Sequence, residues 1–416
     1  MRIVGALRLL IVAIPLAFAA VAPAQAPESV HWVRSWASSQ QVPEPHNALP
    51  SDDLRDATLR QVVRLTIGGE RIRVRVSNLF GTEPLRIGSV HVARSADPAS
   101  ARIVPASDRA VTFGGRSGIA VPAGAEYVSD PIALAAAPMS HLAVSLHLPE
   151  APARQTSHPG SRATSYVLQG DHTGAADLPE AQRVVHWYQL TAVDVAAAPE
   201  NAAIAVLGDS ITDGFGVQPD SDTRWTDFLV RRLRVEPGMR HLAVLNHGLG
   251  GNRILLDGLG PNALARFDRD VLGQPGVKFM ILLIGVNDLG TLTRDAPASG
   301  EAHRALVADM TGALAQMAAR ARERGIVAIG ATILPYGGSE YYHPDAANEA
   351  DRQAVNAWIR APGHFDAVID FDAALRDPAD PARLAARWDS GDGLHPSIAG
   401  YEAMAAAVDL ELFANE

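Results

Sequence analysis

The first half of the chain alternates polar and apolar positions with a period of two. Residues 71–76 read Arg-Ile-Arg-Val-Arg-Val, the pattern of a strand that packs one face on a core. Glycines and prolines separate such segments, and no long helical pattern is evident. We therefore predict a β-sandwich of jelly-roll-like type over residues 27–195. Further strands are expected over residues 61–67, 85–92, 110–113, 142–148 and 184–193.

The pattern changes near residue 196. Residues 204–207 are a continuous apolar run that ends at Gly208, and similar runs follow it. Such runs are typical of parallel strands that are covered on both faces. Helical patterns lie between them, which predicts a three-layer α/β/α domain with a parallel sheet over residues 196–416. Strands are also expected over residues 242–245, 279–284 and 326–333, and helices over residues 222–235, 262–272, 300–324, 346–360 and 397–413.

The first 26 residues have the pattern of a secretory signal peptide. A basic start is followed by an apolar run over residues 9–21 and then by small residues. The apolar run is too short for a transmembrane helix. The alternative to a cleaved signal peptide is that the segment stays attached as an uncleaved membrane anchor. Cleavage after Ala24 or Ala26 fits the small-residue rule, and we favour Ala24 because Pro27 would directly follow the second cut. We therefore expect a secreted or periplasmic protein without an integral membrane span after cleavage.

Composition narrows the chemistry further. The 416 residues include no Cys, which excludes a thiol nucleophile, disulfides and thiolate metal sites. With 36 Lys and Arg against 46 Asp and Glu, the formal net charge is −10. This charge argues against a broad surface for nucleic acid. Apolar residues make up 47% of the chain, enough for a substantial core.

Four polar segments follow the expected strands of the second half, at the sheet edge where α/β folds place their ligand sites. They supply a serine beside glycine, a glycine-rich turn, an asparagine amide, and an aspartate three residues before a histidine. Serine needs a histidine to take its proton, and that histidine needs an acceptor to orient it. The tetrahedral oxyanion needs preorganised N–H donors. The segments are Gly208-Asp209-Ser210, Asn246 to Arg253, Gly285 to Asp288, and Asp392 to Pro396.

In their order and spacing, these segments resemble blocks I, II, III and V of the SGNH (GDSL-type) hydrolase superfamily. The resemblance covers about residues 202–413. It implies that Ser210 is the nucleophile, His395 the general base and Asp392 the group that orients it. It also implies an oxyanion hole from the N–H groups of Ser210 and Gly251 and the Asn287 amide, with Gly250 as the competitor of Gly251. The family needs no metal and no organic cofactor. The rival patterns G-x-S-x-G and H-E-x-x-H do not occur.

Other residues beside these blocks are candidates for lesser roles. Asn252, Arg253, Tyr336 and Tyr341 are candidates for substrate contacts. The two tyrosines stand in a tyrosine-rich loop, residues 335–344, which is a candidate wall of the pocket, and residues 289–299 are a second candidate wall. Asp209 and Asp288 stand beside the catalytic positions. We expect these two acidic residues to support loops through hydrogen bonds. For the arginines of residues 71–76 we expect a solvated or interdomain face. For Trp32, Trp36 and Trp187 we expect core or interdomain packing.

The sequence thus predicts an exported serine ester hydrolase that cleaves short-chain acyl esters, including O-acetyl groups on carbohydrates. The expected partner is the ester substrate, with no nucleic acid. An acyltransferase or lysophospholipase of the same superfamily is the alternative enzyme. A glycan-binding protein with a non-catalytic α/β half is the alternative from another class.

Overall fold

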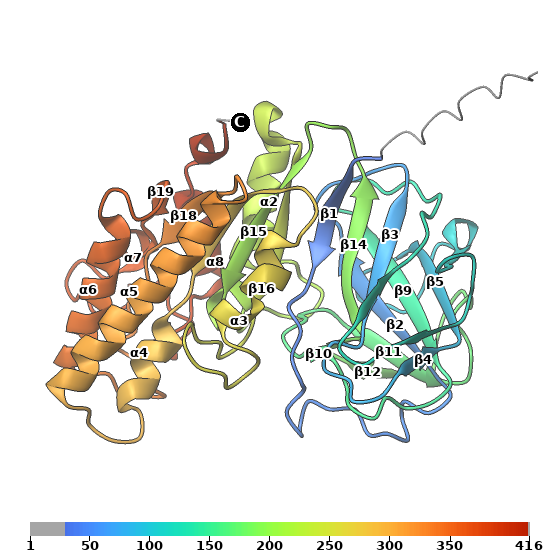
Figure 1. The fold of residues 1–416 in the computed structure, drawn as a ribbon, viewed down its shortest axis with the longest axis horizontal. Coiled ribbons are helices and arrows are strands. Elements are labelled where there is room, and N and C mark those ends of the chain that lie inside the picture. The colour runs from blue at the N-terminus through green and yellow to red at the C-terminus, as the bar shows by residue number, and fades with distance from the viewer. Residues whose placement is uncertain (1–29, 415–416) are drawn as a thin grey trace, which may run out of the picture. The chain divides into compact units, whose positions relative to one another are not determined.

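The computed structural model describes residues 30–414, so the predicted signal peptide lies outside the described residues. From His31 onward the chain is one compact unit (Figure 1). We call residues 30–196 the β region and residues 202–414 the α/β region; the domain boundaries predicted from the sequence stay predictions. Within residues 30–414, no helix has the length and apolarity needed to cross a membrane.

The β region consists mainly of two antiparallel sheets, as the period-two pattern predicts. In spatial order, one sheet contains β1 (Trp32–Ala37), β14 (Leu190–Ala196), β3 (Ile72–Ser77) and β8 (Glu126–Val128). The other contains β12 (Gln182–Val184), β11 (Ser165–Gln169), β2 (Ala57–Arg64), β9 (His141–Leu148), β5 (Ser89–Arg94) and β6 (Arg109–Ala110). Two short pairs complete the region: β10 (Ser157–His158) with β13 (Trp187–Tyr188), and β4 (Leu85–Ile87) with β7 (Ile119–Val121).

Strand β3 shows how the pattern forms this fold. Ile72, Val74 and Val76 are fully buried in the core of the β region, because successive side chains of a strand point to opposite faces. The alternate residues Arg73 and Arg75 are only partly exposed, and both pair with Asp194 on neighbouring β14. These two arginines therefore belong to an ion-pair cluster and do not form a free solvated face.

Several predicted strands of the β region are divided or displaced. The expected strand 85–92 is two strands in different sheets, β4 and β5, separated by Gly88. The expected strand 184–193 is interrupted twice, and Gln189 adopts a positive φ of 53° between β13 and β14. The expected strand 110–113 retains only β6, and strand 61–67 lies earlier, as β2. Apolar content alone does not show where a chain leaves one sheet for another, which is the reason for these errors.

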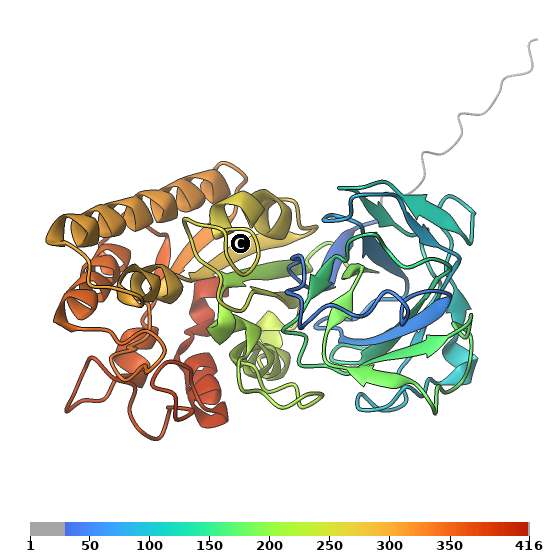
Figure 2. The same cartoon turned by 90° about the horizontal axis from the view of Figure 1, so that it is seen from below.

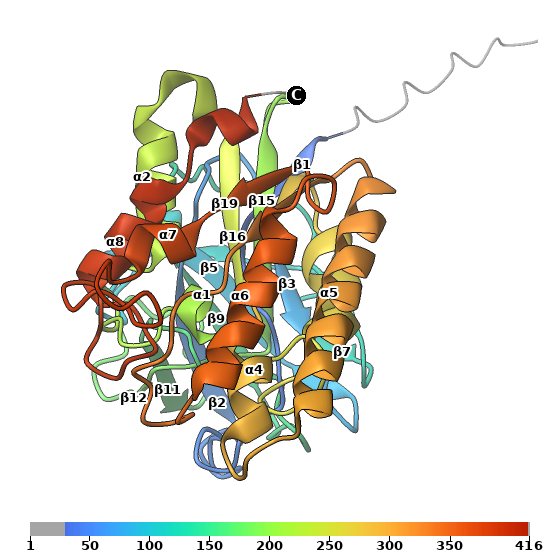
Figure 3. The same ribbon diagram turned by 90° about the vertical axis from the view of Figure 1, so that its left-hand side faces the viewer.

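The α/β region has a five-stranded parallel sheet. In spatial order its strands are β16 (Leu242–Gly248), β15 (Ala202–Gly208), β17 (Val277–Leu283), β18 (Val327–Ala331) and β19 (Ala367–Ile369). Helices cover both faces, as Figures 2 and 3 show. On one face lie α2 (Trp225–Val235), α7 (Phe371–Leu375) and α8 (Ile398–Ala407), and on the other α5 (Gly300–Arg322) and α6 (Ala346–Arg360). The predicted three-layer α/β fold is confirmed.

The helix predictions hold best where apolar spacing is long and regular. Helix α6 has the predicted bounds, whereas the expected helix 397–413 ends at Ala407 and a separate 3₁₀ turn spans Leu410–Phe413. The expected helix 262–272 is α3 (Ala263–Phe267) followed by a π turn over Asp268–Leu272. Short elements gave no readable period, so α1 (Ser210–Asp213), α4 (Val286–Thr293), α7, β19 and β1 were not predicted.

The β region also covers part of the parallel sheet. Ala203 on β15 and Ala243 and Leu245 on β16 belong to the same hydrophobic cluster as the core of the β region. Strand β1 packs against β16. The β region therefore buries apolar surface of the two strands that lead into the Ser210 and glycine-rich segments.

Candidate active site

Ser210 follows the carboxyl end of β15, the strand between β16 and β17 in the parallel sheet. The strand is fully buried up to Gly208, and Asp209 then caps helix α1 by accepting a hydrogen bond from the Ile211 N–H at 3.0 Å. Ser210 is the first residue of α1, and the left-handed Gly214 ends the helix one turn later. This sharp strand-to-helix turn leaves the Ser210 side chain 7% exposed, at the sheet edge predicted for the site.

His395 and Asp392 come from the C-terminal part of the sequence and lie beside Ser210. The Ser210 Oγ lies 2.8 Å from His395 Nε2, and His395 Nδ1 lies 2.6 Å from Asp392 Oδ2. The other carboxylate oxygen of Asp392 accepts hydrogen bonds from the backbone N–H groups of Leu394 and His395. The loop therefore holds the carboxylate and the imidazole in one orientation.

This geometry defines the direction of proton movement. A carboxylate only accepts hydrogen bonds, so His395 Nδ1 donates to Asp392 and Nε2 remains free to accept the Ser210 proton. Partial burial opposes ionisation of Asp392, but the hydrogen bonds from His395 outweigh it and hold the pKa of Asp392 below its usual range. Asp392 is thus a carboxylate at neutral pH, able to stabilise an imidazolium.

The predicted oxyanion donors face the same cavity. Gly250, Gly251 and Asn287 all line it beside Ser210, and Gly251 has a φ of 68°, which favours glycine. The Asn287 Nδ2 donates to the Asn252 carbonyl at 2.8 Å, and its Oδ1 accepts from the Tyr342 hydroxyl at 2.6 Å. These two bonds orient the amide and leave one Nδ2 hydrogen for the cavity. Both glycines remain candidates by position.

Asp209 and Asp288 make the loop-supporting contacts expected of them. The Asp288 carboxylate accepts from the N–H groups of Ile254 and Leu255 and so holds the chain that follows the glycine-rich turn. Burial raises the pKa of Asp209 to about 7 and that of Asp288 to about 6. At moderately acidic pH these two carboxyl groups beside the site are therefore largely protonated and carry little charge.

Arg266 is a buried residue that sequence reasoning missed. Its guanidinium donates to the carbonyls of Gly208 and His247, both at 2.8 Å, and to Asn252 Oδ1 at 3.0 Å. It also pairs with Asp270 at 2.9 Å. One side chain thus ties the end of β15 to the glycine-rich turn. Its place on the short helix α3 carried no sequence signal for this role.

The cavity over Ser210 has a volume of about 910 Å³. Of the four candidates for substrate contacts, Arg253 and Tyr341 line it. Asn252 does not: it is 1% exposed, and its side chain bonds to Arg266 and to the carbonyls of Leu259 and Pro261. Tyr336 is 1% exposed within the core and is also absent from the lining. For these two residues the structure contradicts the prediction, because their side chains point into packed protein.

Other lining residues were not predicted. The Phe215 ring stacks on His395 with centroids 4.1 Å apart, and Phe215 and Leu259 are among the exposed large apolar residues. Thr291 and Arg294 come from the segment 289–299, which was expected to form a wall. Tyr342 stands in the tyrosine-rich loop that the sequence indicated, so the loop was identified but not its inward-facing tyrosine. In the part of the chain that the structure describes, no cluster of three or more His, Asp or Glu could hold a metal ion.

A known protein family matches part of this chain. Residues 206–403 match the GDSL-like Lipase/Acylhydrolase family. No curated protein matches the chain.

Several solved structures are similar to about half of the chain. The acetylxylan esterase Axe2 from Geobacillus stearothermophilus is 22% identical, with a TM-score of 0.39, over 52% of this chain and 95% of that one. LAE5, an α/β hydrolase from the metagenome of Lake Arreo, Spain, is 23% identical, with a TM-score of 0.38, over 53% and 99%. A GDSL-like lipase from Bacteroides thetaiotaomicron is 18% identical, with a TM-score of 0.37, over 51% and 87%.

The family match covers the strand, turn and loop segments that bring Ser210 and His395 together. Residues 206–403 of this chain are therefore a domain of the GDSL-like lipase/acylhydrolase family, which is a family of hydrolytic enzymes.

Proposed function

We propose that the protein hydrolyses short-chain acyl esters through a covalent acyl-Ser210 intermediate, with O-acetyl groups on carbohydrates among its substrates. The observation that carries this proposal is the hydrogen-bonded series from Ser210 Oγ to His395 and on to Asp392, with lengths of 2.8 and 2.6 Å. It opens into a cavity that also presents Gly251 and Asn287.

In the first half of the reaction, Ser210 Oγ attacks the ester carbonyl while His395 Nε2 takes its proton. Asp392 stabilises the imidazolium that forms. The N–H groups of Ser210 and Gly251 and the Asn287 amide donate to the oxyanion of the tetrahedral intermediate. The intermediate then collapses: the bond to the alcohol oxygen breaks, His395 returns the proton to that oxygen, and the acyl group stays on Ser210.

In the second half, water replaces the alcohol. His395 Nε2 takes a proton from the water as its oxygen attacks the acyl carbon, and the same donors hold the second oxyanion. Collapse breaks the bond to Ser210 Oγ, which recovers its proton from His395, and the carboxylic acid leaves. An added alcohol that competes with water at this step would give the acyltransferase alternative.

The cavity supports a large alcohol moiety. Its volume of about 910 Å³ is near the upper end for small-molecule sites, far more than an acetyl group needs. Its wall includes the charged side chains of Arg253, Arg294 and Glu340, which suit hydroxyl groups. The Tyr341 side chain is 60% exposed and offers an aromatic face to a sugar ring.

A second candidate substrate, an ester with a long alkyl chain, is favoured by a neighbouring apolar groove. The groove shares Arg253 and Thr291 with the cavity, and Leu255, Leu256 and Leu292 are among the residues that line it. Leu256 is 62% exposed, so it offers apolar surface at the rim.

The first experiment measures hydrolysis of p-nitrophenyl esters by wild type, Ser210→Ala and His395→Ala. We expect each substitution to lower kcat by about 10⁴- to 10⁶-fold while the circular dichroism spectrum is unchanged. Substantial activity in Ser210→Ala would refute the acyl-Ser210 mechanism. Detection of the acylated Ser210 peptide by mass spectrometry after rapid quenching is the direct positive result.

The acyl length separates the two substrate candidates. If the protein is a short-chain esterase, kcat/KM falls steadily from the acetate ester to the octanoate ester. Leu256→Ser then leaves kcat/KM unchanged for both esters. If the groove binds an alkyl chain, kcat/KM rises with length and Leu256→Ser lowers it for octanoate only. Val235→Ser is the matched control, because Val235 is 74% exposed and does not line either cavity.

We also propose export to the periplasm or the medium. The support is the sequence pattern of residues 1–26. N-terminal sequencing of the protein from the source cells is expected to begin at Gln25 or Pro27, and a retained Met1 would refute cleavage.

A further inference from the structure

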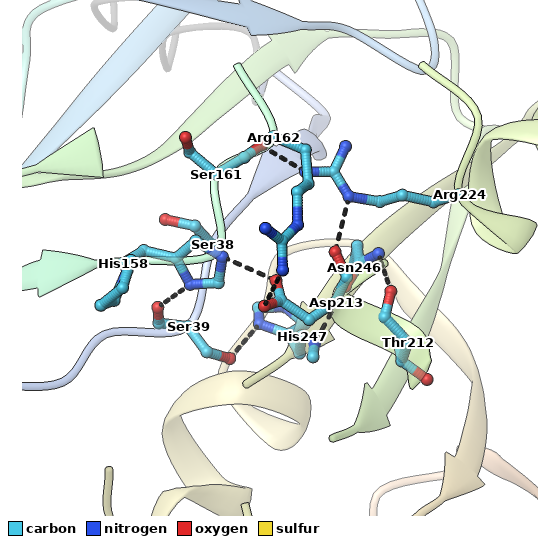
Figure 4. A network of polar contacts seen from close by, with 12 residues as sticks. Ser38, Ser39, His158, Ser161, Arg162, Thr212, Asp213, Arg224, Asn246 and His247 are labelled. Atoms are coloured by element: carbon cyan, nitrogen blue, oxygen red, sulfur yellow. Dashed lines mark hydrogen bonds and ion pairs between the residues drawn. The ribbon is translucent and has the colours of Figure 1, made fainter. Parts of the chain in front are cut away.

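A segment of the β region touches the helix that begins with Ser210. Helix α1 has four residues, and its last residue, Asp213, is 3% exposed. The Asp213 Oδ1 lies 3.0 Å from Nε2 of His158, which stands at the end of β10 (Figure 4). A Cβ on Gly160 would lie 1.7 Å from Asp213 Oδ2, so only glycine allows this close approach. We call residues 157–162 the contact segment.

His158 is held firmly in this position. Its Nδ1 lies 2.7 Å from the Ser39 carbonyl, and its ring stacks on Trp187. Both ring nitrogens therefore lie within hydrogen-bond distance of an oxygen atom, which fixes the orientation of the ring. The side chains of His158 and Asp213 are each only 4% exposed, so the contact between them is buried.

The opposite side of α1 is held by the α/β region. A Cβ on Gly248 would lie 2.2 Å from the Asp213 nitrogen, and Asn246 Nδ2 donates to the Thr212 carbonyl at 2.6 Å. Arg224 joins the two sides, because it donates from Nε to the Asp213 carbonyl at 3.0 Å and from Nη2 to the Ser161 carbonyl (Figure 4). Helix α1 is therefore clamped between the contact segment and the strand that precedes the glycine-rich turn.

The same segment also approaches the other half of the Ser–His pair. The Arg162 guanidinium lies 5.9 Å from the centre of the Phe215 ring, and that ring stacks on His395. Arg162 Nη2 lies 4.0 Å from Asp213 Oδ2. No residue of the contact segment lines the cavity over Ser210. The contact segment therefore contacts residues that adjoin Ser210 and His395. It does not form part of the cavity wall, so substrate contacts fall to other residues.

We propose that the contact segment positions Ser210 for attack, with His158 as a positioning residue that acts through Asp213. This inference rests on the proposed function, in which Ser210 is the nucleophile. In a four-residue helix, displacement of Asp213 is expected to move Ser210, because the residue before Ser210 and the residue after Asp213 complete the helical hydrogen bonds. The Asp213 N–H donates to the Asp209 carbonyl, and the Gly214 N–H donates to the Ser210 carbonyl. Misplacement of a reacting group by about 1 Å costs about 100-fold in rate. The β region is thus part of the catalytic apparatus without touching substrate.

The test uses the full chain and p-nitrophenyl acetate. His158→Ala is expected to lower kcat by about 10- to 100-fold, with KM changed less than about twofold. The rate at which a fluorophosphonate labels Ser210 should fall by the same factor. His158→Gln places an amide donor near the position of Nε2 and should restore part of the rate. A role in stability alone would not produce this rescue or a loss confined to kcat.

The matched control is His147→Ala. His147 also pairs with an aspartate within the β region, Asp56 at 2.9 Å, but neither residue contacts α1. The control should retain wild-type kcat. A kcat of His158→Ala within twofold of wild type, or an equal loss in His147→Ala, would overturn the inference. If His158→Ala does not fold, Asp213→Asn takes its place, since it keeps the volume but removes the charge; a wild-type kcat in that variant would likewise overturn it.

Failure of this inference is distinguishable from failure of the proposed function. If Ser210→Ala is inactive and His158→Ala is fully active, Ser210 is the nucleophile but the β region does not position it. If Ser210→Ala is active, the proposed mechanism itself is wrong.

Discussion

The β region and the α/β region each bury an aspartate, and the two side chains behave in opposite ways. Asp194 and Asp209 are 0% and 1% exposed. Around Asp194 stand three guanidinium groups, from Arg34 at 2.6 Å, Arg73 at 3.0 Å and Arg75 at 3.3 Å. Burial disfavours its charge, but the arginines outweigh burial and lower the pKa of Asp194. Burial dominates at Asp209 and raises its pKa to about 7.

The difference shows that burial alone does not decide the charge of a carboxyl group. In the β region, the charge of Asp194 is matched by surrounding cations and joins β1, β3 and β14. In the α/β region, Asp209 makes its hydrogen bond to Ile211 and has no cation in direct contact among the described residues. The Asp194 cluster stabilises the fold of the β region. The Asp209 hydrogen bond stabilises the turn beside Ser210, and the raised pKa of Asp209 keeps the net charge there low.

The largest expected effect is on the cluster in the β region. Asp194→Ala leaves the buried Arg34 without its partner, which is expected to cost about 3–5 kcal/mol of unfolding free energy. Urea denaturation followed by tryptophan fluorescence measures it. Asp56→Ala, which removes a largely exposed carboxylate, should cost less than about 0.5 kcal/mol. A loss below about 1 kcal/mol for Asp194→Ala would show that the arginines re-solvate easily.

In the α/β region the corresponding loss is expected in rate. Asn287→Ala removes the proposed oxyanion donor and should lower kcat about 10²- to 10³-fold on p-nitrophenyl acetate, with little change in KM. Asn201→Ala is the control, because its amide bonds to the His241 carbonyl and does not line the cavity. Equal kcat in Asn287→Ala and wild type would remove the amide from the proposed oxyanion hole.

The opposite pKa shifts predict a pH dependence. Because the pKa of Asp209 is raised in the folded state, the folded protein binds more protons than the unfolded chain between about pH 4 and 7. This group therefore makes stability fall as pH rises through that window. Asp209→Asn removes the effect, so its stability relative to wild type should increase from pH 5 to pH 8 by on the order of 2 kcal/mol. A relative stability that does not change with pH would place the pKa near its usual value.

The smallest expected effect concerns the orientation of the Asn287 amide. Tyr342→Phe removes the hydroxyl that donates to Asn287 Oδ1, so the amide is less well held and kcat should fall by about tenfold or less. Tyr127→Phe is the control, because Tyr127 lies on β8 of the β region and does not line the cavity. An unchanged kcat in Tyr342→Phe would mean that the bond to the Asn252 carbonyl suffices to orient the amide.

The two regions also differ in how well their sequences predicted them. The α/β region was predicted well, because its buried strands are continuous apolar runs and its polar segments directly follow them. Ser210 and His395, 185 residues apart, could be paired on this basis and lie 2.8 Å apart. In the β region, Gly88 and Gln189 mark changes of sheet or strand that local alternation does not reveal. Asn252 and Tyr336 had residue types suited to binding, but their side chains point into packed protein.

The sequence by itself determined the change from a β pattern to an α/β pattern near residue 196, the parallel sheet and the candidate catalytic residues. Periodicity and strand-end position are local properties of the chain, so they can be read without the tertiary structure. Tertiary structure alone decided the rest. It set the pKa of each buried aspartate, chose Tyr341 over Tyr336 for the cavity wall, and placed His158 of the β region against Asp213 behind Ser210. These outcomes depend on which groups from distant parts of the chain come together in the water-excluded interior. Electrostatic and packing energies are largest there, because charges are poorly screened and side chains are closely packed.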